Sequence, residues 1–255
     1  MLLIDTHCHL YSKQFSGDLD EVIQRAEKEG VAKFYLPAID KGSLPELLAV
    51  EERYPGKCIA MMGLHPCSVR ADYQDELKLV EEWLGRRPFV AVGEIGLDFY
   101  WDRSFEKEQY EAFHRQIDWA LQYKIPIVIH SRESMSQTIE VVRERQDGRL
   151  SGIFHCWSGS VDVAQQIIDL GFYLGIGGVL TYKKAGLDET LRHVSMDHLV
   201  LETDAPYLAP APFRGKRNES SYLKYVVARL AEVKGVSVEE VARITTANAQ
   251  KIFGW

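Results

Sequence analysis

The sequence lacks several features that would place it outside the ordinary class of globular proteins. No apolar run among its 255 residues approaches the roughly 20 residues that a membrane-spanning helix needs. The first ten residues, MLLIDTHCHL, contain neither a basic segment nor a long apolar stretch, so they do not resemble a signal peptide. We therefore expect a cytoplasmic protein that makes no contact with a membrane.

Cysteine is scarce and shows no pairing pattern. The four cysteines are Cys8, Cys58, Cys67 and Cys156, and none belongs to a C-x-x-C motif. That absence removes the usual signature of a dithiol redox site or a zinc ribbon. In a chain of this length, the four residues are more typical of buried, reduced thiols than of a disulfide framework.

The sequence also has fewer positively than negatively charged residues. The chain has 30 Lys and Arg residues against 37 Asp and Glu residues, which gives a formal net charge of −7. Such a protein is not coated with positive charge for non-specific binding to duplex DNA. A role with nucleic acid would therefore require a local basic patch or a bound cation.

A glycine-rich phosphate turn is missing after the first apolar run, where a doubly wound nucleotide-binding sheet would normally carry one. Instead, eight short apolar runs alternate with amphipathic stretches, and most are apolar on both faces, as buried parallel strands are. We predict an α/β fold, a single (β/α)8 TIM barrel spanning residues 1–255, with a doubly wound open sheet as the alternative. The runs are Leu2–Thr6, Lys33–Ile39, Cys58–Gly63, Phe89–Ile95, Ile125–His130, Gly152–Cys156, Phe172–Gly177 and Leu199–Thr203.

The amphipathic stretches predict helices between and after these strands. Ser237–Phe253 is an extra C-terminal helical segment, and its first residues are close to a capping box. The other predicted helices are Asp20–Gly30, Leu44–Tyr54, Ser104–Tyr123, Glu133–Gln146, Val161–Leu170 and Ser220–Lys234.

Two histidines follow the first predicted strand, where the glycine turn is absent. His7 and His9 are two residues apart, so in extended chain their side chains point to the same face. Two imidazoles on one face suit a divalent metal ion. Taken alone, a His-x-His pattern is a weak signal, because it also arises by chance.

The same arrangement recurs along the chain and strengthens the signal. Ionisable residues end four further apolar runs: Glu94, His130, His155 and Asp204. The carboxyl ends of all barrel strands meet at one mouth, so these side chains should converge there. Burying so many polar groups together is unfavourable unless something pairs them, and metal ions would do so.

Glu94 is the central carboxylate of this set in strand order. A bridging carboxylate is a common means of holding two metal ions about 3.5–4 Å apart. We therefore expect one ion to be bound by His7, His9 and Asp204 and a second by His130 and His155, with Glu94 bridging the two.

Six sequence blocks together resemble the signature of the TatD family of metal-dependent deoxyribonucleases, whose wider group consists of amidohydrolase-like barrels. They occur in the family's order and extend from the first strand to the C-terminal helix. The blocks are Ile4-Asp5-Thr6-His7-Cys8-His9-Leu10, Gly63-Leu64-His65-Pro66, Gly93-Glu94-Ile95-Gly96-Leu97-Asp98, His130-Ser131-Arg132, His155-Cys156-Trp157-Ser158-Gly159 and Glu202-Thr203-Asp204-Ala205-Pro206-Tyr207-Leu208.

The resemblance implies a two-metal phosphodiesterase that hydrolyses DNA through a metal-bridging hydroxide, including 3′–5′ exonuclease action. Two divalent ions per subunit would be Mg²⁺, Zn²⁺ or Mn²⁺, because the histidines favour the softer ions and the family favours Mg²⁺. Asp204 would serve as general base while also binding metal, with Glu94 as its catalytic partner. We expect a DNA substrate with single-stranded or 3′ ends, and a monomer in preference to an oligomer.

Other residues are predicted to contact the substrate or to support the ligands. Arg132 and Trp157 each follow a predicted ligand by two residues, so they should project from the rim, one to a phosphate and the other to a base. His65 should face the site as a substrate group. Lys216 and Arg217 form a basic loop after the last strand, where barrels often bind phosphate. Glu202 and Asp98 are expected to orient ligands.

Two other functions fit the same residues. An amidohydrolase-type enzyme could use this site to attack an amide or ester carbonyl, including that of a charged tRNA. Against the carbamylated-lysine type of amidohydrolase, the fourth strand ends in Glu94 rather than lysine. A non-catalytic barrel that binds nucleic acid is the third hypothesis, and the intact set of ligands argues against it.

Overall fold

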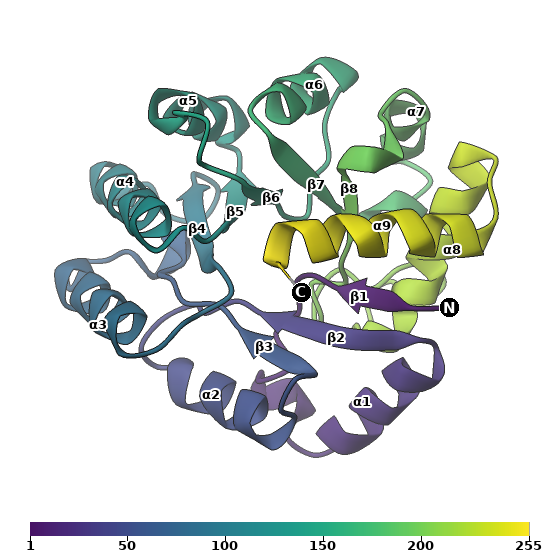
Figure 1. Ribbon diagram of the computed structural model, residues 1–255, viewed down its shortest axis with the longest axis horizontal. Coiled ribbons are helices and arrows are strands. Elements are labelled where there is room, and N and C mark those ends of the chain that lie inside the picture. The colour runs from purple at the N-terminus through teal and green to yellow at the C-terminus, as the bar shows by residue number, and fades with distance from the viewer. Residues whose placement is uncertain (255) are drawn as a thin grey trace.

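The computed structural model describes residues 1–254 and arranges parallel strands in a ring, with helices outside it (Figure 1). Within these residues there are eight strands, in the order that the apolar runs predict. They are β1 (Leu3–Asp5), β2 (Val31–Leu36), β3 (Cys58–Ala60), β4 (Val92–Asp98), β5 (Ile127–Arg132), β6 (Gly152–Phe154), β7 (Phe172–Ile176) and β8 (Leu199–Leu201).

Backbone hydrogen bonds join the strands into two arcs and connect the arcs at both seams. One arc runs β1-β2-β3 and the other β4-β5-β6-β7-β8, with every pairing parallel. Between β3 and β4, the amide of Gly93 donates to the carbonyl of Met62 at 3.0 Å. Between β8 and β1, the amide of Thr6 donates to the carbonyl of Leu201 at 3.0 Å. The strands therefore encircle a common interior, which confirms the predicted (β/α)8 barrel.

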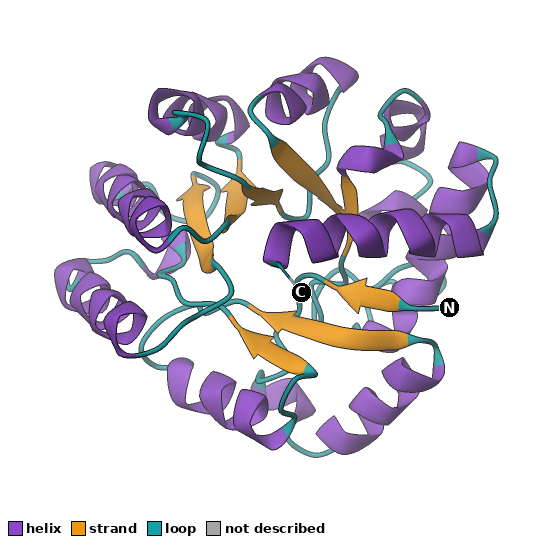
Figure 2. Ribbon diagram, in the orientation of Figure 1, coloured by secondary structure: helices purple, strands orange, loops and turns teal. Residues whose placement is uncertain are grey.

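The helices form the outer layer around the strands (Figure 2). Seven of them match the predicted helices closely, but α3 and α7 were not predicted. No helix in residues 1–254 is long and apolar enough to cross a membrane. The helices are α1 (Leu19–Lys28), α2 (Leu44–Arg53), α3 (Tyr73–Arg86), α4 (Glu106–Tyr123), α5 (Met135–Arg145), α6 (Val161–Asp169), α7 (Leu187–Arg192), α8 (Leu223–Lys234) and α9 (Val238–Phe253).

The barrel interior contains an apolar layer that is separate from the larger core between strands and helices. Each strand or the residue beside it contributes one side chain: Ile4, Tyr35, Met61, Ala91, Val128, Ile153, Tyr173 and Val200. Helix α9 crosses this end of the ring (Figure 1), and Phe253 stacks on Tyr35 with ring centroids 4.0 Å apart. The predicted C-terminal helical segment thus closes the amino-terminal end of the barrel.

The predicted ligands lie directly above this apolar layer. Side chains two residues apart on a strand point to the same face, so Val128 is followed inside the barrel by His130, and Ile153 by His155. The apolar layer and α9 therefore close one end, and polar side chains accumulate at the other end, where the strands terminate.

The loop after β8 is tied to α1 by two arginines. Arg25 makes a forked pair of hydrogen bonds to the nearly buried carboxylate of Glu219, at 2.9 and 2.6 Å. Arg217 makes a similar pair to Asp18, at 2.7 and 2.6 Å. Forked guanidinium–carboxylate pairs of this kind fix both position and orientation. They hold this loop against the outside of the barrel.

We predict that Arg25→Met destabilises the protein at neutral pH more than at acid pH. Burial raises the pKa of Glu219, but the bonds from Arg25 outweigh it and hold that pKa below its usual value. The stabilisation is therefore fully present above the ordinary pKa of glutamate and is lost as the pH falls through the folded value. Urea unfolding should show a loss of about 1–3 kcal/mol at pH 7 that shrinks below about pH 4.

Arg243→Met is the matched control for this experiment. Arg243 pairs with Glu240 on the exposed face of α9, where solvent screening leaves such a pair with little effect on stability. A pH-independent loss in Arg25→Met, or an equal loss in both variants, would contradict the role of the Glu219 pair.

Candidate metal centre

An open cavity of about 980 Å³ lies at the carboxyl ends of the strands. Five of the six predicted ligands line it, and the sixth, His7, is completely buried beneath them. The structure therefore brings His7, His9, Glu94, His130, His155 and Asp204 together in one cluster at the base of the cavity, as their positions at strand ends predict.

The carboxylate of Glu94 stands at the centre of this cluster. Its Oε2 lies 3.1 Å from Nε2 of His7 and 3.8 Å from Nε2 of His9. Its Oε1 lies 2.9 Å from Nδ1 of His130 and 2.9 Å from Nε2 of His155. The two oxygens of one carboxylate thus face two different pairs of histidines.

His9 is held in a single tautomer by a tyrosine that sequence reasoning missed. The hydroxyl of Tyr11 donates to the carbonyl of Pro37 at 2.5 Å, so its oxygen accepts from Nδ1 of His9 at 2.8 Å. With the proton on Nδ1, the lone pair of His9 is on Nε2, which lies 3.3 Å from Oδ1 of Asp204. Fixing the distal nitrogen in this way is typical of histidines that bind metal.

His130 is held by Asp98 on the side away from Glu94. Nε2 of His130 lies 2.8 Å from Oδ2 of Asp98, and the other carboxylate oxygen accepts the amides of Tyr100 and Trp101 at 3.0 and 3.2 Å. Burial raises the pKa of Asp98, but His130 and these amides outweigh it and lower the pKa to about 2. Asp98 is therefore an ionised carboxylate that orients His130.

Glu202 lies against His155, on the side of the ring away from Glu94. It is completely buried, accepts a hydrogen bond from the amide of Cys156, and has Oε1 3.4 Å from Nδ1 of His155. Gly175 leaves room for it, since a Cβ at that position would lie 2.2 Å from Oε2 of Glu202. Glu202 is thus placed to orient His155 from behind.

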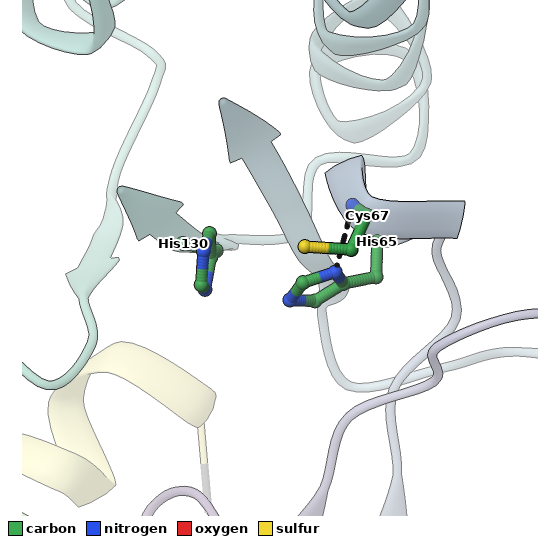
Figure 3. Close-up of side chains that lie close together, drawn as sticks. All are labelled: His65, Cys67 and His130. Carbon is green, nitrogen blue, oxygen red and sulfur yellow. Dashed lines mark hydrogen bonds between the residues drawn. The ribbon is translucent and has the colours of Figure 1, made fainter. Parts of the chain in front are cut away.

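His65 faces the cluster but is arranged as a hydrogen-bond donor. The amide of Cys67 donates to Nδ1 of His65 at 3.0 Å, the bond drawn in Figure 3. Since that lone pair is occupied, the proton of a neutral ring must be on Nε2, which points at Oε1 of Glu94 from 3.3 Å. His65, Cys67 and His130 lie close enough together to bind a metal ion. However, this tautomer disfavours metal binding by Nε2 of His65, because that nitrogen carries a proton.

The electrostatics of the cluster favour a cation. Burial opposes ionisation of Glu94, but the surrounding histidines outweigh it and hold its pKa well below the usual value. Burial also disfavours charge on His130 and His155, yet neighbouring carboxylates raise the pKa of both rings. Burial lowers the pKa of His7 and of His65. A divalent ion would replace the protons that His130 and His155 hold because of their raised pKa values.

The donor set fits divalent metal ions. Imidazole nitrogens and carboxylate oxygens are ligands that Zn²⁺ and Mn²⁺ accept readily, and Mg²⁺ accepts the carboxylates. Groups whose donor atoms all lie within 4.8 Å of one another occur on both sides of Glu94. They are His7 with His9 and Glu94, Glu94 with His130 and His155, and His7 with His155 and Asp204.

Of the two residues predicted to project from the rim, only Arg132 does so. β5 continues to Arg132, so the alternation that begins at His130 holds and the guanidinium lines the cavity. The prediction for Trp157 is wrong, because its indole is 1% exposed and belongs to the core. β6 ends at Phe154, and Cys156 adopts a left-handed φ of 46°, so alternation no longer applies.

The two predictions for the basic loop after β8 have different outcomes. Lys216 is exposed and lines the cavity, as predicted, together with Arg214. The prediction for Arg217 is wrong, because its guanidinium turns away from the cavity to Asp18 and lies over the ring of Phe15. A charged partner on α1 decides its direction, and the sequence of the loop gives no sign of that partner.

Several residues at the site were not predicted from the sequence. Tyr11 had an available signal, since it follows His9 by two residues, as His9 follows His7. Cys67 follows His65 in the same way. Tyr100 and Trp101 line or border the mouth from the loop after β4, and their only sequence signal is their position just beyond Asp98.

Comparisons with known proteins agree with this geometry. A family model described as TatD related DNase matches residues 4–254. The chain is 38% identical over 253 residues to YabD of Bacillus subtilis, named an uncharacterized metal-dependent hydrolase, with 99% of each chain covered. It is 31% identical to TATDN3 of Mus musculus, named provisionally as a deoxyribonuclease, covering 98% of this chain and 88% of that one.

The structural match is similarly complete. The crystal structure of YjjV, a TatD homolog from Escherichia coli, matches with a TM-score of 0.93 and 32% identity, covering 99% of this chain and 98% of that one. The family model, the relatives and the superposition all extend across nearly the whole chain. The chain therefore belongs to the TatD-related DNase family of metal-dependent hydrolases.

Proposed function

We propose that this protein hydrolyses phosphodiester bonds in DNA with two divalent ions held on either side of Glu94. The observation that carries the proposal is the division of the Glu94 carboxylate, whose two oxygens face separate pairs of histidines. A buried carboxylate between two such sets is the arrangement that a binuclear hydrolytic centre requires.

The ligands divide naturally into two sets. His7, His9 and Asp204 would hold one ion, His130 and His155 the other, and Glu94 would bridge them. When bound, such a pair of ions lowers the pKa of a water and neutralises charge on phosphate oxygens. Mg²⁺, Mn²⁺ and Zn²⁺ are the ions to consider for this donor set.

Asp204 is the proposed general base. Burial raises the pKa of its carboxyl, but the neighbouring histidines His9, His155 and His7 outweigh burial and lower it below the usual value. The side chain is 14% exposed and lines the cavity, so an ionised oxygen faces the substrate space. It can orient a water and accept its proton as the water attacks phosphorus.

Four donors are available for the phosphate. Nε2–H of His65 points into the cluster, and the guanidinium of Arg132 lines the mouth beside it. Arg214 and Lys216 enter the same cavity from the loop after β8. This local positive charge, with the metal ions, would attract DNA to a protein whose formal net charge is −7. The family description and the name of the mouse relative support DNA as the substrate.

We predict that Glu94→Gln weakens both metal sites, whereas His130→Ala mainly empties one. Glu94 contributes an oxygen to each set, while His130 belongs to only one. After equilibrium dialysis against Zn²⁺ or Mn²⁺, elemental analysis should give about two ions per chain for the wild type and about one for His130→Ala. Glu94→Gln should bind fewer ions than the wild type, because both sites lose a ligand. His114→Ala, on α4, is the control and should keep the full content. Full metal content in Glu94→Gln would rule out the bridge.

We predict that Asp204→Asn lowers kcat by about 10²- to 10⁴-fold and changes KM far less. The base acts in the transition state, and the substitution removes the charge with little change of shape. The assay is cleavage of labelled single- and double-stranded DNA with a panel of divalent cations, and it should stop when chelator is added. Asp197→Asn, which lies before β8 at the other end of the barrel, should retain activity.

Four outcomes of these experiments would reject the proposal. Cleavage that persists in chelator, or full activity in Asp204→Asn, would remove the metal-assisted mechanism. Rapid turnover of small amides or of charged tRNA without DNA cleavage would identify an amidohydrolase-type enzyme instead. Metal binding and DNA binding without any turnover would identify a non-catalytic barrel.

We predict that the double variant Arg214→Ala/Lys216→Ala reduces the salt dependence of single-stranded DNA binding. Each phosphate that is no longer neutralised by a basic side chain should lower the slope of log K against log salt by about 0.7. Arg243→Ala/Lys251→Ala, two exposed positions at the opposite end of the barrel on α9, provides a charge-matched control and should leave the slope unchanged. An unaltered slope in the double variant would show that these two residues are ordinary surface charges.

A further inference from the structure

Exposed apolar side chains gather around the mouth of the cavity. Among residues 1–254, Trp101 is 68% exposed and Tyr100 47% exposed, and both belong to the loop after β4. Trp101, Tyr207 and Leu208 line the 980 Å³ cavity together with the predicted metal ligands. Exposed apolar surface that is concentrated at a site commonly marks contact with a ligand.

The loop that carries the two rings is held firmly. One oxygen of Asp98 accepts the backbone amides of both Tyr100 and Trp101. The side chain of Gln109 donates to the carbonyl of Asp98 at 3.1 Å and accepts its amide at 2.9 Å. The guanidinium of Arg132 lies 3.7 Å from the ring centroid of Tyr100 and 5.3 Å from that of Trp101. These rings are exposed because the loop places them in solvent.

The same contacts connect the rings to the chemistry. The second oxygen of Asp98 holds His130, so a single carboxylate fixes both a metal ligand and the aromatic loop. Trp101 lies between the large cavity and a smaller one of about 330 Å³ that Arg70, Asp102 and Gln109 also line. A strand whose phosphate lies between Arg132 and the ligands would therefore bring an adjoining base to the indole.

We propose that Trp101, supported by Tyr100, is the surface on which an unpaired base next to the scissile phosphate stacks. The inference rests on the proposed function and names the part of the substrate that this end of the cavity recognises. An indole face accepts any of the bases, because every base has a π-face, so the contact is tolerant of sequence. A base in a duplex is already stacked and paired, so Trp101 favours single strands and frayed ends.

The test measures kcat/KM on a single-stranded oligonucleotide with the metal-loaded protein. Trp101→Ala should lower kcat/KM by about 5- to 100-fold, mainly through KM, because stacking contributes equally before and in the transition state. Trp101→Phe should keep most of the activity, since it keeps a ring. Trp83→Ala is the matched control, because Trp83 also carries an arginine over its ring but lies on α3, outside the lining of both cavities.

An abasic scan distinguishes stacking from a structural effect. A series of oligonucleotides carries one abasic residue at successive positions from the 3′ end. At the position that meets Trp101, the abasic residue should lower the kcat/KM of the wild type as much as Trp101→Ala lowers it on the intact oligonucleotide. The same abasic residue should cause no further loss of kcat/KM in Trp101→Ala. If Trp101→Ala has the same kcat/KM as the wild type on an oligonucleotide that the wild type cleaves, this inference is overturned and the proposed function is not. Additive losses at every position would also overturn it, whereas absence of DNA cleavage by the wild type would overturn the proposed function as well.

Discussion

The buried carboxylate of Glu94 is the interaction on which the rest of the site depends. A charged carboxylate so deep in a barrel would be strongly unfavourable without partners. Here five histidines surround it, at distances from 2.9 to 3.8 Å, and they hold its pKa well below the usual value. Neighbouring carboxylates in turn raise the pKa of His130 and His155 against the effect of burial. A pair of divalent cations would satisfy both sides of this balance, which is why the geometry favours a binuclear centre.

The barrel supplies that charge cluster with a rigid base. An apolar layer fills the interior below it, and Phe253 of α9 closes the far end on Tyr35. Above the layer, a further set of polar groups fixes the ligands. Tyr11 fixes the tautomer of His9, Asp98 orients His130, and Glu202 lies behind His155. Each of these ligands therefore enters the cavity with its direction already determined, and little reorganisation would accompany metal binding.

Asp98 extends this order outward from His130 to the exposed aromatic loop after β4. Its two oxygens divide their contacts between His130 and the backbone of the Tyr100–Trp101 loop. The proposed stacking surface at Trp101 and the orientation of His130 thus depend on one ionised side chain with a pKa of about 2.

The sequence alone determined the barrel and the set of ionisable residues that meet at its mouth, because both follow from local patterns. Alternation along a strand and the meeting of strand ends at one mouth are consequences of backbone geometry, so residues such as His130, His155 and Asp204 could be assigned together. The same rule placed Arg132 correctly, because β5 continues that far. It failed for Trp157, because β6 ends early and Cys156 turns the chain inward. The direction of Arg217 depends on a partner distant in sequence, and the exposure of Trp101 depends on the path of its loop. Only the tertiary structure decides which side chains such contacts bury and which they leave facing the cavity.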